Sequence, residues 1–385
     1  EGREIPPLVE GLLSAGNDSF YSTVGEGAQK CRSVFLPASA TVDAVAERPG
    51  VILLDDVRRR GEPLASNPSA SVLDIGEGVL CLEFHSKMNT ISGETLELVR
   101  TGVDLAEQQG YAGLVIGNQA ANFSLGANIK ELAAAAMARD WKAIEGMIRG
   151  FHETVLKIRY SSVPVVCAVQ GMALGGGCEI PLACDAIQAA GETYIGLVEL
   201  GVGLIPAGGG TREMACRAAE AVPAGYPVDS FGFLMRYFEN IAMAKTSGSA
   251  ADARQLGYLL AGDGISMNRD RVIADARSRV LAMASQGHCP PRPRESVKVA
   301  GEPGIAELKI LLSQYSGGGF ISEYDEFLAG RMAHVLCGGN IDAENTVSEQ
   351  YLLDLECEVF LELLGQQKTL DRIEHTLKTG KPLRN

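Results

Sequence analysis

Two glutamates stand in apolar, glycine-rich surroundings, where a charged side chain is uncommon. Glu179 ends the glycine-rich stretch Gly171–Glu179, and Glu199 lies inside Gly196–Gly201. Burying an ionised carboxylate without a partner is costly, so such groups are rare in protein interiors. Two of them in similar surroundings suit acid/base chemistry near neutral pH. We therefore predict that Glu179 and Glu199 act together as a catalytic acid and base.

Each glutamate also has an ordinary structural explanation. Glu179 could be a helix-start residue whose carboxylate satisfies the helix dipole. Either carboxylate could also belong to a buried salt bridge with an arginine such as Arg212. Both alternatives stay open at the level of the sequence.

Two loops at strand-to-helix junctions offer backbone N–H groups without partners. The glycine run follows the apolar strand Val165–Val169, and Phe123–Glu131 follows the strand Leu114–Ile116. The first amides of a helix have no acceptor inside it, and the helix dipole favours an anion beside them. Two such loops together can hold a developing oxyanion, and losing one donor typically costs about 100- to 1000-fold in rate.

The elements that must position these loops alternate between strands and helices. Residues 72–75 and 79–84 flank a short Gly-Glu-Gly turn and predict a hairpin. Apolar residues recur at helical spacing over 98–106 and 144–158. Repeated strand–helix units favour an α/β architecture with mostly parallel pairing. Beyond about residue 210 the chain is predicted to be largely helical.

The composition excludes several classes of protein. The chain has 385 residues, of which 46% are apolar, and its net charge is -14. This acidity argues against a nucleic-acid partner, because phosphate backbones are bound by a surplus of basic residues. No apolar run approaches the roughly 18 residues needed to span a membrane, so no membrane partner is expected. The nine cysteines show no CxxC spacing and indicate reduced thiols in a cytoplasmic protein.

No metal site is expected. The five histidines and the cysteines show no ligand spacing, so each histidine is interpreted as structural, including His152.

Three motifs together resemble the enoyl-CoA hydratase/isomerase (crotonase) superfamily. They are Ala127–Lys130, then Ala173–Glu179 with Glu199 twenty residues further on, and Ile205–Arg212. The similarity runs from about residue 71 to the C-terminus. It implies a crotonase-like core of ββα repeats forming a spiral, followed by a helical C-terminal region. It also implies an acyl-CoA substrate, no cofactor, and a homo-oligomer, either a trimer or a hexamer.

The resemblance also assigns roles to residues. The backbone N–H groups of Ala127 and Gly176 would hold the thioester oxygen, while Glu179 activates water and Glu199 protonates C2. Retention of both glutamates favours hydration of 2-enoyl-CoA to 3-hydroxyacyl-CoA in fatty-acid β-oxidation. The alternatives are a 3-enoyl-CoA isomerase that relies mainly on Glu199, and a non-catalytic acyl-CoA-binding module. The remaining substrate contacts that the resemblance implies are Lys87, Asn128, Ile129, Lys130 and Gly175.

Three segments are expected along the chain. Residues 1–70 resemble the end of a 3-hydroxyacyl-CoA dehydrogenase domain plus a linker, residues 71–270 form the crotonase-like core, and 271–385 form the helical C-terminal region. The chain starts with Glu1, which is consistent with a piece of a bacterial dehydrogenase/hydratase fusion. No GxGxxG motif follows a strand, so no NAD binding is expected. A stretch around 218–238 departs from the family pattern as an insertion, and Asn128 stands where the family often has Asp.

Overall fold

The centre of the molecule is a seven-stranded sheet. The computed structural model describes residues 4–385 except 26–29, 40, 47, 224–229 and 343–344. The sheet has the order β10-β9-β8-β7-β6-β5-β4. Neighbours from β6 to β10 run parallel, while β5 is antiparallel to both β4 and β6. The strands are β4 (Ala65–Ser66), β5 (Ala70–Asp74), β6 (Val79–Phe84), β7 (Gly113–Gly117), β8 (Val165–Leu174), β9 (Ala186–Gly196) and β10 (Gly264–Ser266).

These strands confirm the α/β architecture and the hairpin expected from the sequence. The β5–β6 pair joins Val72 to Leu82 across an antiparallel ladder. Strand β8 continues well past the predicted strand at Val165–Val169 and reaches Leu174, directly before the glycine run. Because of this extension, the glycine run Gly175–Gly177 begins directly at the end of β8 and leads into α6.

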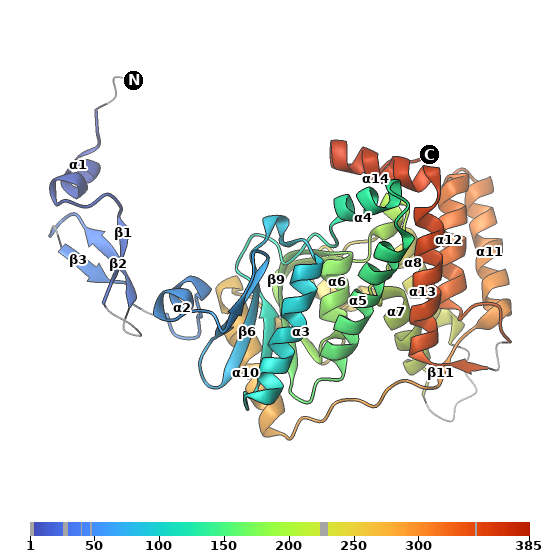
Figure 1. Ribbon diagram of the computed structural model, residues 1–385, viewed down its shortest axis with the longest axis horizontal. Helices are drawn as coiled ribbons and strands as arrows, with labels where there is room; N and C mark the ends of the chain where they lie inside the picture. The colour runs from blue at the N-terminus through green and yellow to red at the C-terminus, as the bar shows by residue number, and fades with distance from the viewer. Residues whose placement is uncertain (1–3, 26–29, 40, 47, 224–229, 343–344) are drawn as a thin grey trace.

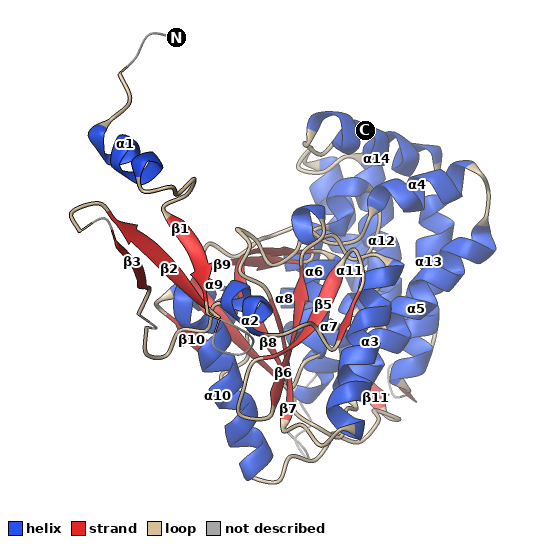
Figure 2. Cartoon of the chain, turned by 60° about the vertical axis from the view of Figure 1, so that its left-hand side comes forward, coloured by secondary structure: helices blue, strands red, loops and turns tan. Residues whose placement is uncertain are grey.

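Helices cover both faces of the sheet, as Figure 2 shows. Successive strand residues point to opposite faces, so in β7 Leu114 joins one apolar core and Val115 the other. The first core contains α3 (Gly93–Gln108), against which α5 (Trp141–Arg159) packs. The second core contains α10 (Val272–Ser285), and α2 (Leu54–Arg60) contributes the fully buried Leu54.

The second half of the chain is largely helical, as predicted. Helix α13 packs against α5 and α7, and α14 packs against α4 (Ile129–Met137). The C-terminal helices therefore return to the part of the fold that carries the glycine loops (Figure 1). The helices not yet given bounds are α6 (Gly176–Ala183), α7 (Gly210–Glu220), α8 (Phe231–Ala242), α9 (Ala250–Leu256), α11 (Gly301–Gly317), α12 (Glu323–Leu336), α13 (Glu349–Leu364) and α14 (Gln367–Thr379). A ribbon of β11 (Val297–Lys298) and β12 (Thr346–Val347) accompanies them.

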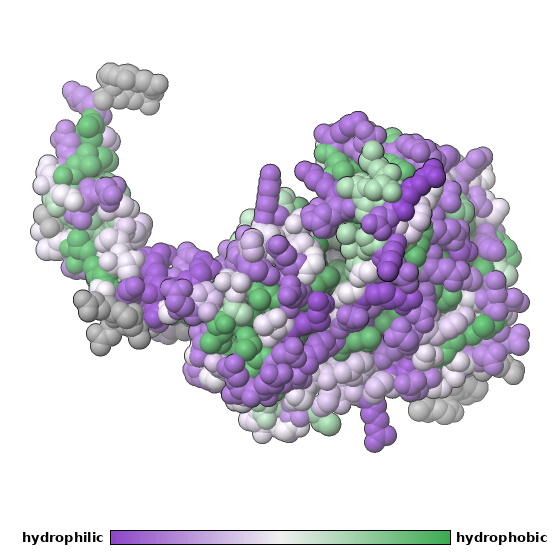
Figure 3. All heavy atoms as spheres, viewed as in Figure 1, coloured by the Kyte–Doolittle hydropathy of each residue, from purple (hydrophilic) through white to green (hydrophobic). Residues whose placement is uncertain are grey.

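The described residues that precede α2 project from this body (Figure 1). Helix α1 (Pro7–Ser14) precedes an antiparallel sheet of β1 (Tyr21–Val24), β2 (Cys31–Leu36) and β3 (Thr41–Ala44). Hydrophobic residues lie on the surface of this segment (Figure 3). Leu8 and Tyr21 are among its exposed side chains.

The packing begins the main body earlier than residue 71. Strand β4 pairs with β5, and Gln119 bonds the backbone of Ile52 and Leu54. Likewise α10 lies on the sheet, so the segment expected as a separate helical region from residue 271 starts with a helix of the sheet core.

The predicted insertion at 218–238 spans the end of α7 and the first part of α8, and its residues 224–229 lie outside the described residues. In the described part of the chain, no helix is both long and apolar enough to cross a membrane.

Candidate active site

The turn between β8 and α6 places Glu179 in a first helical turn. Gly175 precedes α6 with a φ of 56°, a conformation that side-chain-bearing residues rarely adopt. A Cβ at this position would lie 2.9 Å from Oε1 of Glu199. Glycine is therefore required here both by the backbone and by the close approach of the second glutamate.

The Glu179 carboxylate is buried and held by another loop. Its Oε1 accepts hydrogen bonds from the backbone N–H of Gly208, at 2.8 Å, and of Gly210, at 2.7 Å. Its partners therefore lie just before α7 and at the first residue of α7, rather than in the first turn of its own helix. The helix-start explanation is not sufficient for this residue.

Glu199 opens a short 3-10 helix, η3 (Glu199–Val202). Its Oε2 atom is buried and has no hydrogen-bond partner among the described residues. Burial raises the pKa of Glu199 to about 7. Near neutral pH a substantial fraction of this side chain is therefore protonated, as a proton donor requires.

The two glutamates interact electrostatically. Burial raises the pKa of Glu179 well above its usual range, and the charges of Glu199 and of Glu356 raise it further. The salt-bridge alternative fails, because Nη1 of Arg212 lies 3.0 Å from Glu213 and 3.4 Å from Glu349. Within the described residues neither Glu179 nor Glu199 forms an ion pair with a basic side chain. Glu179 is buried, and Glu199 is half-buried with its Oε2 atom buried.

The two amides predicted to bind an oxyanion lie side by side. A Cβ on Gly176 would come within 3.3 Å of the backbone nitrogen of Ala127, and one on Gly126 within 3.3 Å of the nitrogen of Gly176. A β-bridge between Ile91 and Ala127 holds the first loop in place. In the described part of the chain neither the Ala127 nor the Gly176 N–H donates a hydrogen bond, so both are available to an anion.

The predicted substrate contacts gather around the Ala127 loop. Lys87 is exposed in the turn η2 (Lys87–Asn89). This turn contacts the Ala127 loop, because the N–H of Leu125 donates to the Met88 carbonyl. On the other side of the loop Lys130 is exposed in the first turn of α4.

Two further predicted contacts flank the start of α4. Asn128 bonds Glu131 through its side chain at 2.6 Å, and Ile129 is half-buried. Contact of these residues and of Gly175 with a substrate stays a prediction.

Sequence reasoning missed a third buried carboxylate beside the pair. Glu356 on α13 is fully buried and accepts hydrogen bonds from the backbone N–H of Gly209, at 3.0 Å, and of Arg212, at 2.5 Å. His152 lies beside it, with Nε2 2.8 Å from the Ala207 carbonyl oxygen and 3.3 Å from Oε2 of Glu356. Three acidic residues occur within Asp354–Glu358, and the sequence offers no signal that one of them is buried at the site.

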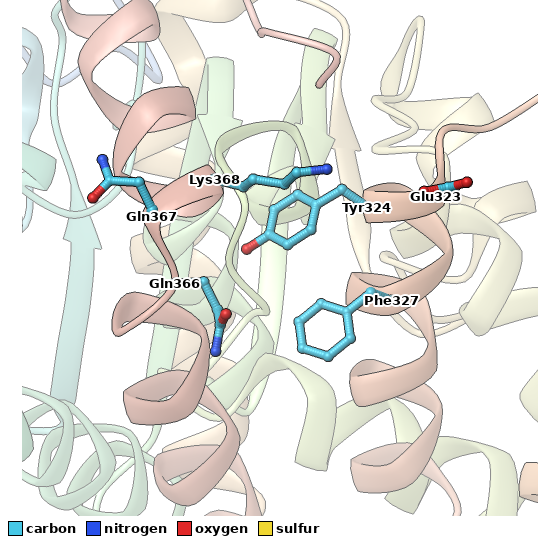
Figure 4. Close-up of a pocket in the computed structure, with 6 residues that line it drawn as sticks. All are labelled: Glu323, Tyr324, Phe327, Gln366, Gln367 and Lys368. Atoms are coloured by element: carbon cyan, nitrogen blue, oxygen red, sulfur yellow. The ribbon is translucent and has the colours of Figure 1, made fainter.

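A separate hollow lies between α12 and α14, as Figure 4 shows. It encloses about 410 Å³ and includes neither catalytic candidate. Its lining residues are Glu323, Tyr324, Phe327, Gln366, Gln367 and Lys368. The hydroxyl of Tyr324 bonds Thr369, whose Oγ1 donates to the Gly203 carbonyl at the end of η3. Helices α12 and α14 therefore hold the η3 segment that contains Glu199 in place.

No group of three or more His, Cys, Asp or Glu side chains among the described residues is arranged to hold a metal ion. The cysteines are free thiols, and Cys178 on α6 is one of the buried ones. Burial raises the pKa of Cys178 well above its ordinary value, so this neighbour of the glutamates stays a neutral thiol.

Comparison with known proteins identifies the relatives of this chain. Residues 74–222 match the family described as enoyl-CoA hydratase/isomerase. A probable 3-hydroxyacyl-CoA dehydrogenase of Bacillus subtilis is 40% identical over 100% of the chain and 47% of its own length. A putative fatty acid oxidation complex trifunctional enzyme of Rickettsia prowazekii is 28% identical over 83% of the chain and 40% of its own length. The chain thus spans less than half the length of these two curated relatives.

Solved structures confirm the crotonase-like fold. An enoyl-CoA hydratase from Bacillus halodurans has a TM-score of 0.54 at 18% identity, covering 80% of this chain and 99% of its own. One from Mycobacterium avium subsp. paratuberculosis has a TM-score of 0.51 at 19% identity, covering 82% of this chain and 98% of its own.

Proposed function

We propose that the chain, whose residues 74–222 match the enoyl-CoA hydratase/isomerase family, adds water to 2-enoyl-CoA thioesters, giving 3-hydroxyacyl-CoA. One observation carries the proposal. The buried Glu179 and the half-buried Glu199 lie beside two adjacent backbone amides. Among the described residues neither glutamate has a basic partner, and neither amide has an acceptor. Hydration of a conjugated thioester needs these parts: a hole for the oxyanion, a base for water and an acid for C2.

The amides of Ala127 and Gly176 would bind the thioester oxygen. Two N–H donors polarise the carbonyl, which makes C3 electrophilic and stabilises the enolate formed when water attacks. Because both amides are fixed by the turns that surround them, little reorganisation is needed as charge develops on the oxygen.

The hydrogen bonds of the two glutamates favour one division of labour. Two buried carboxylates that repel each other hold a proton between them. The two amide donors on Glu179 come from another segment and stabilise its ionised form. Glu199 accepts only from the backbone of Val198 and of Glu199 itself among the described residues, and its buried Oε2 has no partner there. Glu179 would therefore take the proton of the water that attacks C3, and Glu199 would give its proton to C2. Solvent exchange returns both side chains to their starting states.

The proposal is tested by a hydration assay with crotonyl-CoA and with long-chain 2-enoyl-CoA substrates. We expect turnover by the unaltered chain, and at least about a 100-fold lower kcat for both Glu179→Gln and Glu199→Gln. Glu362→Gln is the matched control, because this residue of α13 pairs with Arg331 away from the site. An unaltered rate in Glu179→Gln would refute the paired-carboxylate mechanism.

The same variants separate the alternatives. A 3-enoyl-CoA isomerase would convert 3-enoyl-CoA without hydrating crotonyl-CoA, and it would depend mainly on Glu199. A non-catalytic module would bind the thioesters without turnover of either substrate.

We further propose that the chain is the hydratase portion of a β-oxidation fusion protein, with residues 1–70 derived from a dehydrogenase domain. The names and greater lengths of the relatives support this proposal. The trimer or hexamer, the cytoplasmic location and the lack of a cofactor stay predictions from the sequence.

A further inference from the structure

Residues 207–212 comprise the loop before α7 and the start of α7, and are called the loop 207–212 here. They are held from two sides by carboxylates of different helices. On one side, Glu179 of α6 accepts the N–H groups of Gly208 and Gly210 on its Oε1 atom. On the other side, Glu356 of α13 accepts two further N–H groups of the same loop. The amides thus divide between the two carboxylates, and each carboxylate faces a different side of the loop.

The Glu356 side of this arrangement is closed to solvent. Glu356 has no exposed surface, and Oε2 and Oε1 accept from Gly209 and Arg212 respectively. His152 supplies the remaining polar contact, from α5. These contacts join the loop to both α13 and α5 and so hold it in place.

The loop has little freedom to move without moving Glu179. A Cβ on Gly208 would lie 2.5 Å from Oε2 of Glu179 and 2.7 Å from the ring of Phe151. A Cβ on Gly210 would lie 2.7 Å from Oε1 of Glu179. A displacement of the loop backbone is therefore passed directly to the carboxylate that rests on it.

We propose that Glu356 is a positioning residue for the hydration reaction, which sets the place of the Glu179 carboxylate by anchoring the loop 207–212 from the opposite side. The inference rests on the proposed function, because it assigns Glu356 a role in that reaction. Glu356 has no exposed surface and bonds the backbone of Gly209 and Arg212, so its effect passes through the loop. Glu356 also has an electrostatic effect on the site, because its negative charge raises the pKa of both Glu179 and Glu199.

The first test compares Glu356→Gln with the control Glu362→Gln. Glutamine offers one acceptor where two N–H groups point, so one loop amide loses its partner. We expect kcat for crotonyl-CoA to fall at least about tenfold, with KM changed less than about threefold, because a misplaced base affects the chemical step rather than binding. Glu362→Gln is expected to keep both constants. An unchanged kcat in a folded Glu356→Gln protein overturns the proposal.

A double-mutant cycle asks whether Glu356 acts through Glu179. In a Glu179→Gln background, adding Glu356→Gln is expected to lower kcat by less than about twofold, because the base is already lost. A further tenfold loss in that background would mean that Glu356 acts independently, and would overturn the inference. If Glu179→Gln alone leaves the rate unaltered, the proposed function fails instead, so the two failures are distinguishable.

Variants of His152 keep the proposal testable if Glu356→Gln does not fold. His152→Gln retains an N–H donor toward the Ala207 carbonyl and Glu356, whereas His152→Leu removes it at similar volume. We expect kcat to fall about tenfold in the leucine variant and less than about threefold in the glutamine variant. Equal, wild-type kcat in both variants would show that this anchoring is irrelevant to the reaction.

Discussion

Replacing Glu199 with glutamine is expected to change how the stability of the protein depends on pH. Burial raises the pKa of Glu199 from the ordinary 4.5 to about 7. The unfolded chain exposes this carboxyl to water, so over this interval the folded protein keeps a proton that the unfolded chain releases. The contribution of Glu199 to the unfolding free energy is therefore complete below pH 4.5 and is lost as the pH rises through 7.

The size of the effect follows from the two pKa values. A difference of about 2.5 in pKa, at about 1.36 kcal/mol for each, corresponds to about 3 kcal/mol of unfolding free energy. Glutamine cannot ionise, so Glu199→Gln avoids this loss. Glu179 is present in both proteins, and its weaker repulsion in the variant acts in the same direction. Relative to the unaltered protein, the variant should therefore gain about 3 kcal/mol between pH 4.5 and pH 8.

Urea unfolding followed by circular dichroism measures this difference directly. The unaltered protein, Glu199→Gln and the control Glu362→Gln are compared at several pH values and one protein concentration. The control should follow the unaltered protein at every pH, because Glu362 is a partly exposed residue paired with Arg331. If the unfolding free energies of the unaltered protein and Glu199→Gln differ by a constant amount from pH 4.5 to 8, Glu199 does not have a raised pKa and the acid role assigned to it falls.

Two further substitutions test the supports of the site. Gly175→Ala should lower kcat for crotonyl-CoA at least about tenfold, because the new Cβ meets Glu199 and the backbone has a positive φ. Its matched control is Gly146→Ala inside α5, where a Cβ meets nothing within 4 Å, and stability should rise by about 0.5–1 kcal/mol in denaturant unfolding. Arg372→Ala should lower the unfolding free energy by about 3 kcal/mol, because Asp325 loses its buried partner and keeps only the exposed Arg384. An equally stable variant would contradict this.

Much of the sheet could be predicted because its residues follow a strict physical pattern. The strands around Leu114 and Val165 are short apolar runs, and burial on both faces of a parallel sheet requires such runs. The glycine run was informative for a related reason. At Gly175 the backbone has a positive φ and leaves no room for a side chain. Only glycine suits such a position, so the tight turn could be predicted from the residue type alone.

The partners of the glutamates could not be predicted, because they are backbone groups or lie far away in the chain. The N–H groups of Gly208 and Gly210 carry no side-chain signal of what they bind. Glu356 sits on a helix among other acidic residues, and only the packing of α13 against α5 and α7 decides which of them is buried. His152 is interpreted from the sequence as structural, and its contact with Glu356 depends on that same packing.

The helices from residue 349 onward hold Glu179 and Glu199 in place, although neither glutamate has a basic partner among the described residues. Helix α13 reaches the loop under Glu179 through Glu356, and α14 reaches the η3 segment of Glu199 through Thr369 and Arg372. Thr369 Oγ1 donates to Gly203 at 2.7 Å, and Arg372 donates to the Leu200 carbonyl at 3.2 Å.

These supports lie outside the matched family region, which ends at residue 222. Carboxylates that repel each other in a buried site tend to move apart or to admit water, and both responses cost packing in the neighbouring segments. Holding each segment by separate helices makes that movement expensive. Because the two glutamates cannot move apart, their repulsion and burial keep both pKa values raised. Raised pKa values are what acid/base chemistry near neutral pH requires of carboxyl groups.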